Sequence, residues 1–400
     1  MDCAKIKNLM LFFWVCFPTL IFPQKVSVMQ KHSNGKEFNI DVYAAFQNEA
    51  PILKTSQFVD DIEFVPLEIT DDCLLSNYLK TIVVTSKDII VYDYEGCYRF
   101  DRSGKFLNKI GSRGQGPGEY INAMSVTVDT LNQWVYFPDR DKNRIVKYDF
   151  SGKHLANLKG VNVGRRIYIH KPMELLVDDA YYQFAKKGKR FCLGLYSEKE
   201  KRTLSKMSCD YQHDIPRMAM CDPIVYSFNG SLYAKDFWCD TIYRVTNSNR
   251  LDAYAVIDRG KFQHRATNDE SLMTGKQDSR DRMILGINRM NETDRYIFMS
   301  SNQGFCIYDK QMKKTFAGDG KENKLCVEDD LYGSPGFKGD HFPSNMGGNE
   351  YYTFRHAHEF VEKGKGKHSV TGQKYDAYLK MIEKLDEEDN PVIMIVKMKK

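Results

Sequence analysis

The sequence predicts an all-β protein folded as a six-bladed β-propeller, and three observations carry this prediction. Short apolar runs rich in Val, Ile and Tyr alternate with polar turns, and 24 Tyr and 24 Phe in 400 residues favour strands. The motif FDRSGK at 100–105 returns as YDFSGK at 148–153, which is 48 residues later. Four short strands repeated at this period describe one propeller blade.

The repeats share one internal pattern of four strand-like runs. In the first unit these are Thr81–Val84, Ile89–Tyr92, Cys97–Phe100 and Phe106–Ile110. An Asp-x-Ser-Gly turn follows the third run, because Asp accepts hydrogen bonds within its own turn and Gly tolerates a positive φ. The pattern predicts units at 79–111, 122–160, 165–208, 222–258 and 284–318, a polar insertion at 261–282 and a sixth unit around Glu350–Phe354.

The two ends of the chain are expected to complete the sixth unit together. Ile62–Glu68 near the N-terminus and Val392–Val396 near the C-terminus both have the composition of strands. Pairing them would remove the bare strand edges that an unclosed ring leaves. A helix is predicted at Gln373–Glu387, just before the last strand, because its apolar residues recur on one face.

The first 24 residues have the composition of a secretory signal peptide. Lys5 and Lys7 precede the apolar run Leu9–Phe22, which is short for a membrane span. A cleaved signal is favoured, and a lipoprotein anchored at Cys16 or an uncleaved anchor is the alternative. The protein is therefore expected to be exported to the periplasm or the cell surface, without a membrane span once the signal is removed.

The rest of the chain is expected to divide into an arm and the ring. Residues 25–57 form the predicted N-terminal arm, with a candidate strand at Phe38–Val42, and residues 58–400 form the propeller. Eight cysteines lie beyond the signal, and no two form a Cys-x-x-Cys pair. Buried free thiols are favoured over disulfides, because a chain of this length can build a core without them.

Three segments together resemble a known family. They are VPLE at 65–68, IGSRGQGPGEY at 110–120 and EDNPV at 388–392. They resemble the exported bacterial six-bladed β-propeller proteins, which are distantly similar to NHL-repeat propellers, over roughly residues 58–400. The resemblance implies a six-bladed fold and an envelope or extracellular location. It implies no reaction, because most members of that family are of unknown function.

The Gly-rich stretch 111–118 is the most distinctive segment of the chain. A phosphate-binding loop would need a strand-to-helix passage, whereas predicted strands lie on both sides here. The favoured interpretation is a tight connector from the rim of blade one to the axis of blade two. The alternative is a ligand site near the central channel that uses Arg113, Gln115, Glu119 and Tyr120.

Metal sites have weak support. His356 and His358 would share a face if their segment is a strand, and His341 lies upstream as a further candidate ligand. A solvated or packed histidine pair is favoured, so no metal and no cofactor is predicted. Asp139–Asp141 and Asp71–Asp72 lack the spacing of an EF-hand loop and are expected to be turn residues.

Composition and motifs also limit the classes of function that the sequence supports. The net charge of +5 over 400 residues is too small to mark a nucleic-acid binder. The chain has no Gly-x-Ser-x-Gly and no His-Glu-x-x-His motif. The leading hypothesis is a non-enzymatic binding module whose ligand is a glycan, a peptide or an envelope protein at the channel face. The alternative is a metal-dependent lyase or hydrolase with its site in the central channel, because a fold alone does not fix a function.

Overall fold

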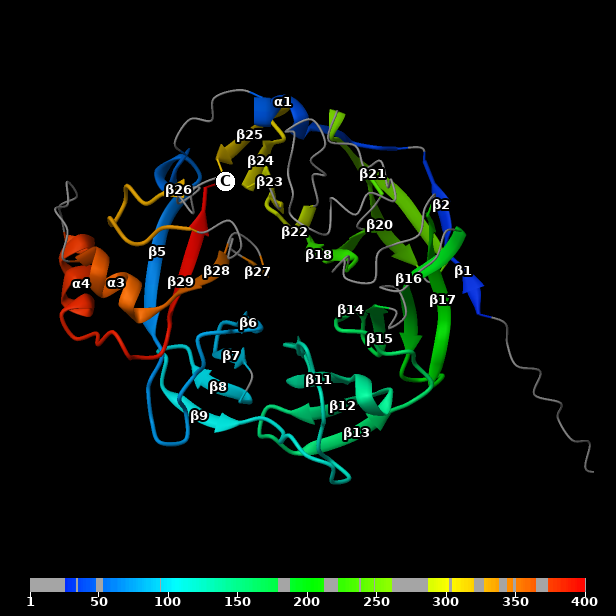
Figure 1. The fold of residues 1–400 in the computed structure, drawn as a ribbon, viewed down its shortest axis with the longest axis horizontal. Helices are drawn as coiled ribbons and strands as arrows, with labels where there is room; N and C mark the ends of the chain where they lie inside the picture. Colours follow the sequence, from blue (N-terminus) through cyan, green and yellow to red (C-terminus); the bar gives the residue numbers. More distant parts are fainter. Residues whose placement is uncertain are drawn as a thin grey trace, which may run out of the picture.

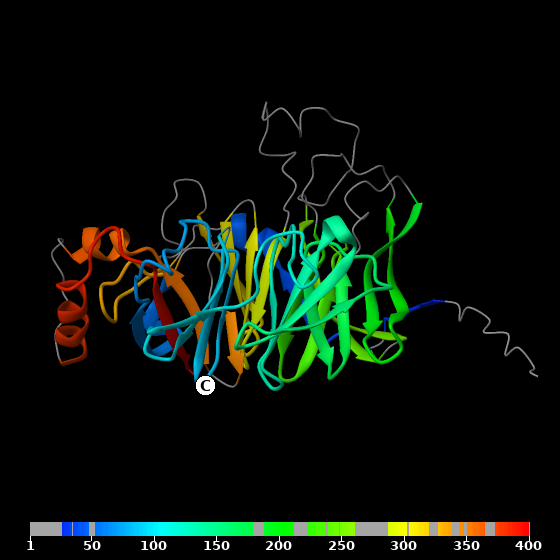
Figure 2. The same cartoon turned by 90° about the horizontal axis from the view of Figure 1, so that it is seen from below.

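Six small sheets stand around one axis (Figure 1), and seen edge-on they form a disc (Figure 2). The computed structural model describes residues 26–33, 35–47, 53–93, 95–178, 188–211, 222–236, 239–247, 249–260, 287–301, 304–319, 327–337, 344–347, 350–364 and 373–399. The predicted signal peptide at 1–24 and the predicted insertion at 261–282 lie outside these residues.

Blades 1 to 5 follow one another along the chain, and each pairs its four strands in chain order. Blade 1 has β6 (Thr81–Val84), β7 (Asp88–Tyr92), β8 (Cys97–Asp101) and β9 (Phe106–Lys109). Blade 2 has β10 (Thr127–Asp129), β11 (Trp134–Asp139), β12 (Arg144–Asp149) and β13 (His154–Leu158). Blade 3 has β14 (Ile167–Lys171), β15 (Glu174–Asp178), β16 (Gly188–Ser197) and β17 (Arg202–Tyr211). Blade 4 has β18 (Ile224–Phe228), β19 (Ser231–Lys235), β20 (Thr241–Asn247) and β21 (Arg250–Asp258). Blade 5 has β22 (Ile287–Glu292), β23 (Tyr296–Ser301), β24 (Gly304–Asp309) and β25 (Lys314–Asp319).

The repeated Asp-x-Ser-Gly turn joins the third and fourth strands of the first two blades. In blade 2, Asp149 Oδ1 accepts the Ser151 N–H at 2.9 Å, and blade 1 has the same turn at 101–105. Gly152 has a φ of +89°, and a Cβ there would lie 2.8 Å from the carbonyl oxygen of Lys109 in the previous blade. The turn glycine therefore serves the contact between blades as well as the hairpin.

Blade 6 takes strands from both ends of the chain, which confirms the predicted closure. Its strands, from the axis outward, are β27 (Ser344–Gly347), β28 (Glu350–Arg355), β29 (Val392–Met398) and β5 (Val59–Pro66). β29 and β5 are antiparallel, with a register that runs from Val392 opposite Pro66 to Met398 opposite Val59. Five consecutive apolar residues of β29, 392–396, are buried. The ring thus closes through a fully packed strand.

Two helices lie between β28 and β29 and stand at the side of the disc (Figure 2). They are α3 (Ala357–Gly364) and α4 (Gln373–Ile382). α4 is the predicted helix, but it ends before the predicted limit at Glu387. Downstream of it, Asp389 Oδ2 accepts the Asp386 N–H at 2.8 Å and Asp386 Oδ1 accepts the Glu388 N–H at 3.0 Å. These carboxylates satisfy the backbone in a turn and compete with continuation of the helix.

An N-terminal arm follows the outer edge of the ring past blades 3 to 5 (Figure 1, blue). β1 (Ser27–Val28) pairs in parallel with β17, whereas β2 (Gln30–His32) and β3 (Phe38–Asp41) pair in parallel with β21. The arm continues through α1 (Val42–Gln47), β4 (Leu53–Lys54), which pairs with β26 (Val327–Glu328), and the 3-10 turn η1 (Thr55–Gln57). β17 and β21 have ten and nine residues, whereas β9 and β13 have four and five. The arm therefore covers long outer edges, which are the ones most prone to pair with other chains.

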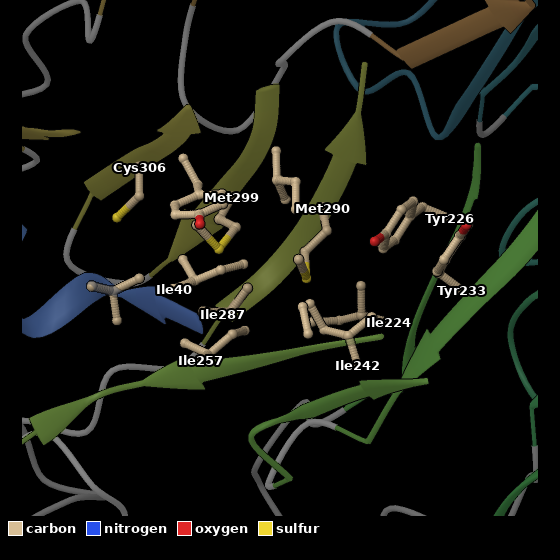
Figure 3. Packing of buried hydrophobic residues seen from close by; sticks show 14 of the residues in the cluster. Ile40, Ile224, Tyr226, Tyr233, Ile242, Ile257, Ile287, Met290, Met299 and Cys306 are labelled. Carbon is tan, nitrogen blue, oxygen red and sulfur yellow. The ribbon is translucent and has the colours of Figure 1, made fainter. Parts of the chain in front are cut away.

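The arm also contributes to the hydrophobic core. Ile40 of β3 is fully buried and packs among residues of blades 4 and 5 (Figure 3). Its neighbours in this cluster include Ile242 and Ile257 of blade 4 and Met290 and Met299 of blade 5. Removing a buried aliphatic side chain of this size costs about 2–5 kcal/mol. The arm is thus integral to the interface between these two blades.

The contact at Gly152 predicts a stability difference between two glycine substitutions. Gly230 also has a positive φ, of +69°, but nothing lies within 4 Å of a Cβ placed there. G230A should therefore cost about 1 kcal/mol from backbone strain alone. G152A should cost at least about 1 kcal/mol more, because its Cβ also meets the Lys109 carbonyl oxygen. Denaturant unfolding measures both costs, and equal losses would contradict the interblade role of Gly152.

Candidate functional site

Buried aspartates anchor the loops at one end of the ring. Because strands alternate in direction, the connection from second to third strand and the connection to the next blade lie at the same end, which we call the loop end. Asp93, Asp139 and Asp178 are buried at the end of the second strand in blades 1, 2 and 3. Their carboxylates accept backbone N–H groups of the loop from the preceding blade, from Ser76 at 2.7 Å, Ile121 at 3.3 Å and Arg166 at 2.9 Å respectively.

An ionisable cluster lies at the loop end of the innermost strands of blades 3 and 4. It consists of Arg165, Arg166, Tyr168, Asp178 and Asp222, and we call it the inner-rim cluster. Arg165 Nη1 lies 3.4 Å from Asp222 Oδ2. Protein surrounds the Arg166 side chain on most sides, yet solvent still reaches it. The side chains of Arg165 and Asp222 are 21% and 18% exposed, so the cluster is accessible from outside.

Burial sets the protonation behaviour of this cluster. It raises the pKa of Asp178 to about 6, although backbone N–H groups of Arg166 and Arg165 bond to the carboxylate. Burial also raises the pKa of Tyr168, and Tyr168 and Asp222 in turn raise the pKa of Arg166. A Cβ on Gly164 would lie 2.2 Å from Asp178 Oδ1, so this close packing depends on glycine. Asp178 therefore changes charge close to pH 6.

A second ionic group lies at the loop end of blade 4. Lys235 and Arg259 are both buried, and Arg259 Nε lies 2.5 Å from Asp240 Oδ1. Lys235 Nζ donates to the carbonyl oxygen of Asp236 at 2.9 Å. Burial, followed by the charge of Arg259, lowers the pKa of Lys235 to about 8. Asp236 is buried just after the second strand, which is the position that Asp93 has in blade 1.

Two of the four residues predicted from the Gly-rich stretch are tied into the loop itself. The Glu119 carboxylate accepts the Gly116 N–H at 2.8 Å, and a Cβ on Gly114 would lie 2.1 Å from Glu119 Oε2. Tyr120 is buried, and its ring stacks on that of Phe137 with 4.5 Å between centroids. Glu119 and Tyr120 therefore hold the shape and position of the loop.

The other two predicted residues, Arg113 and Gln115, are exposed. Arg113 Nε donates to the carbonyl oxygen of Ile121 at 3.1 Å. The part of the loop between Gln115 and Tyr120 lies on blade 2, where the Tyr148 hydroxyl donates to the carbonyl oxygen of Gly118. These contacts agree with a connector between blades 1 and 2, and a ligand role for the exposed pair stays a prediction.

The histidines predicted as weak metal candidates do not lie on a strand. β28 ends at Arg355, His356 directly precedes helix α3 and His358 lies in its first turn, with the His356 N–H bonded to Glu359 Oε2 at 3.0 Å. Their rings are stacked, with centroids 5.7 Å apart. The strand arrangement considered for this pair is therefore wrong, and His341 lies outside the described residues. In the part of the chain that the structure describes, no three His, Cys, Asp or Glu side chains gather as a metal site would require.

Asp139, the cysteines and the helices were also subjects of sequence predictions. Asp139 is bonded within its blade, because Arg144 Nε lies 3.0 Å from its Oδ2. None of the six described cysteines forms a disulfide, namely Cys73, Cys97, Cys192, Cys209, Cys239 and Cys306. Across the described ranges, none of the helices has the length and apolar character that a bilayer crossing needs.

Sequence reasoning missed the inner-rim cluster. Arg165, Arg166 and Asp222 lie in loops and belong to no recognisable motif. A signal was nevertheless present, because the apolar second strands of three blades all end in Asp, as IIVYD, VYFPD and ELLVD. An acidic residue closing a buried strand needs a partner, and that partner is the incoming loop.

The raised pKa of Asp178 predicts a pH dependence of stability. The pKa of Asp178 is about 6 in the folded chain against an ordinary value of 3.8, so this acid binds more protons when folded. The ionised carboxylate therefore destabilises the fold increasingly between these pH values. D178N keeps an acceptor for Arg166 and cannot ionise. It should therefore gain stability relative to wild type as pH rises from about 4 to about 6, by about 3 kcal/mol at most.

D101N provides a control of opposite sign for the same measurement. The Ser103 hydroxyl lowers the pKa of Asp101, so the contribution of this carboxylate is present above its unfolded pKa and is lost as pH falls. D101N should consequently lose stability relative to wild type as pH rises toward about 4, and the difference should stay constant from there to about pH 6. Denaturant unfolding across this pH range would contradict the account if D178N showed no pH-dependent difference from wild type.

Several solved structures are similar to this chain. A Bacteroides fragilis NCTC 9343 protein inferred to be exported has a TM-score of 0.63 and 16% identity, covering 91% of this chain and 99% of that one. A member of the DUF4221 family from Bacteroides vulgatus has a TM-score of 0.47 and 9% identity, covering 88% and 99%. Virginiamycin B lyase from Staphylococcus aureus has a TM-score of 0.38 and 9% identity, covering 67% and 77%.

The first of these structures, at 16% identity, shares the propeller fold with this chain. No curated protein matches the sequence. The sequence does match the family DUF4934, described as a domain of unknown function, over residues 37–397, which include all six blades and most of the arm. The chain therefore belongs to the DUF4934 family.

Proposed function

We propose that this chain is an exported binding module that recognises its ligand at the loop end of the ring, around the inner-rim cluster. The observation that carries the proposal is Arg166. Its side chain reaches solvent, while its backbone N–H is held at 2.9 Å by the buried Asp178. A guanidinium positioned in this way can bind a ligand with little reorganisation of its loop.

The chemistry of the cluster suits recognition of a polar ligand. Arg165 and Arg166 supply planar donors, Asp222 supplies acceptors and Tyr168 adds a half-buried ring. Glycans and peptides both present hydroxyl, amide or carboxylate groups that pair with such side chains. The ligand class we propose is therefore a glycan or a peptide, including a segment of an envelope partner protein.

The same contacts favour binding over acid–base catalysis. Asp178 is the group whose pKa of about 6 would suit proton transfer. It is buried, however, and its Oδ1 accepts the Arg166 N–H, so its role is to position the loop. We accordingly assign no reaction to the cluster.

The proposal of export rests on the leader-like segment at 1–24. The Bacteroides fragilis protein of the same fold is itself inferred to be exported. Periplasm and cell surface are both compatible with such a segment, and attachment through a lipid at Cys16 is the alternative to cleavage. Mass spectrometry of the mature N-terminus distinguishes cleavage from lipid attachment.

A ligand screen followed by a point substitution tests the proposed site. The wild-type chain is screened on a glycan array and a peptide library, and the affinity of the best ligand is measured. R166A should weaken that affinity about tenfold or more, because guanidinium contacts at a binding site carry a large share of the energy. Denaturant unfolding of R166A should still show one cooperative transition, which separates the loss of a ligand contact from the loss of the fold.

Arg140 supplies the matched control for this experiment. It lies in the 3-10 turn η2 (Arg140–Lys142), between the second and third strands of blade 2, and so at the same end of the ring. R140A should bind the ligand as tightly as wild type. Equal affinities for R166A and wild type, or equal losses in both variants, would show that the ligand binds elsewhere.

A further inference from the structure

A second surface lies across the ring from the inner-rim cluster, where blade 6 meets blade 1. The loop from β5 to β6 turns at 70–73, and Thr70 and Cys73 exchange both backbone hydrogen bonds, at 3.3 and 2.9 Å. Ile69 and Leu74 flank this bridge, one on each side of the turn. Cys73 is fully buried, whereas the side chains of Ile69 and Leu74 face solvent.

Asn390 and Asp93 hold this hairpin and the loop after it in place. Asn390 is buried, and its Nδ2 donates to the carbonyl oxygens of Glu68 at 2.7 Å and Cys73 at 3.1 Å. Its Oδ1 accepts the Leu75 N–H at 2.9 Å. Asp93 anchors the following residue of the same loop. A hairpin fixed at this many points loses little conformational entropy when a partner binds.

Large apolar side chains on this hairpin and shortly after it are exposed to water. Ile69, Leu74 and Tyr78 are 46%, 61% and 72% exposed. They are three of the nine large apolar side chains that are exposed in the described part of the chain, and they fall within ten residues of sequence. Exposed apolar groups that occur together mark interaction sites more often than scattered ones do.

Acidic residues lie at the tip of this hairpin and in a neighbouring segment of the chain. Asp71 and Asp72 form the exposed tip of the hairpin. The segment 383–389 adjoins it through Asn390, and has five acids against one lysine. Figure 1 shows this red segment ahead of β29 beside the blue loop that leaves β5. An acidic face is notable in a chain whose net charge is +5.

We propose that this face, formed by Ile69, Leu74, Tyr78, Asp71, Asp72 and the segment 383–389, binds a cationic segment of a partner protein. The acidic residues attract Lys or Arg side chains and disfavour anionic partners. The exposed Ile69 and Leu74 side chains would pack against an apolar side chain that lies between those cations in the partner segment. The partner segment is therefore one that alternates basic and apolar residues. This surface is independent of the inner-rim cluster, because blades 6 and 1 lie opposite blades 3 and 4 in the ring.

Synthetic peptides provide the probe for this proposal. A fluorescent peptide of alternating lysine and leucine should bind the wild-type chain, and its affinity should fall as salt rises from about 0.05 M to about 0.5 M. A peptide of the same length with alternating glutamate and leucine should bind at least about tenfold more weakly. Equal binding of the two peptides would overturn the proposed charge complementarity.

Two variants and one control locate the binding site. I69S/L74S removes the apolar pair and D71N/D72N removes the charge at the tip, and each should weaken binding of the lysine–leucine peptide about tenfold. L131S removes an 89% exposed leucine from blade 2 and should leave binding unchanged. Unaltered binding in both variants, or an equal loss in L131S, would overturn the proposal. If I69S/L74S unfolds more easily than wild type, D71N/D72N alone decides the result.

Discussion

The antiparallel pairing of β5 with β29 is the contact on which the rest of the structure depends. Blades 1 to 5 are local meanders, in which each strand pairs with its neighbour in sequence. Only blade 6 joins the two ends of the chain, and it does so through β29, whose residues 392–396 are buried. The entropic cost of closing so long a loop grows only slowly with its length, so a well-packed strand can outweigh it. Without this pairing, β29 and β5 would present bare edges.

Closure has consequences around the whole ring. Each outer strand leads to the next blade by a loop that must reach the axis, and the buried aspartates Asp93, Asp139 and Asp178 bind those loops by their backbone N–H groups. The loops are therefore rigid where they are anchored, while their remaining side chains are available for recognition. The arm completes this arrangement by pairing with the long outer strands β17 and β21. Both proposed binding surfaces follow from this scheme, because each combines an anchored loop with exposed side chains.

Sequence reasoning found the features that repeat and missed those that do not. The shared Asp-x-Ser-Gly turns predicted the blade period correctly, because the same hydrogen bonds recur at Asp101 and Asp149. Helix α3 was not predicted, since its first turn is capped by Glu359 on the His356 N–H and lacks a Ser, Thr, Asp or Asn cap. The role of the Gly-rich stretch could not be read either, because Gly114 is required by the nearby Glu119 carboxylate, a contact that exists only in the folded loop. The inner-rim cluster brings together residues of two blades that are distant in sequence, and no local sequence pattern predicts such a contact.

Native-state amide hydrogen exchange of the full chain tests the ring closure most directly. If the seam holds the ring together, amides paired between β5 and β29 should exchange only with global unfolding, as slowly as the central strands of blades 1 to 5. Fast exchange of the β5 amides, with blades 1 to 5 still protected, would show that the ring persists with its seam open. That result would contradict the central role assigned to this pairing.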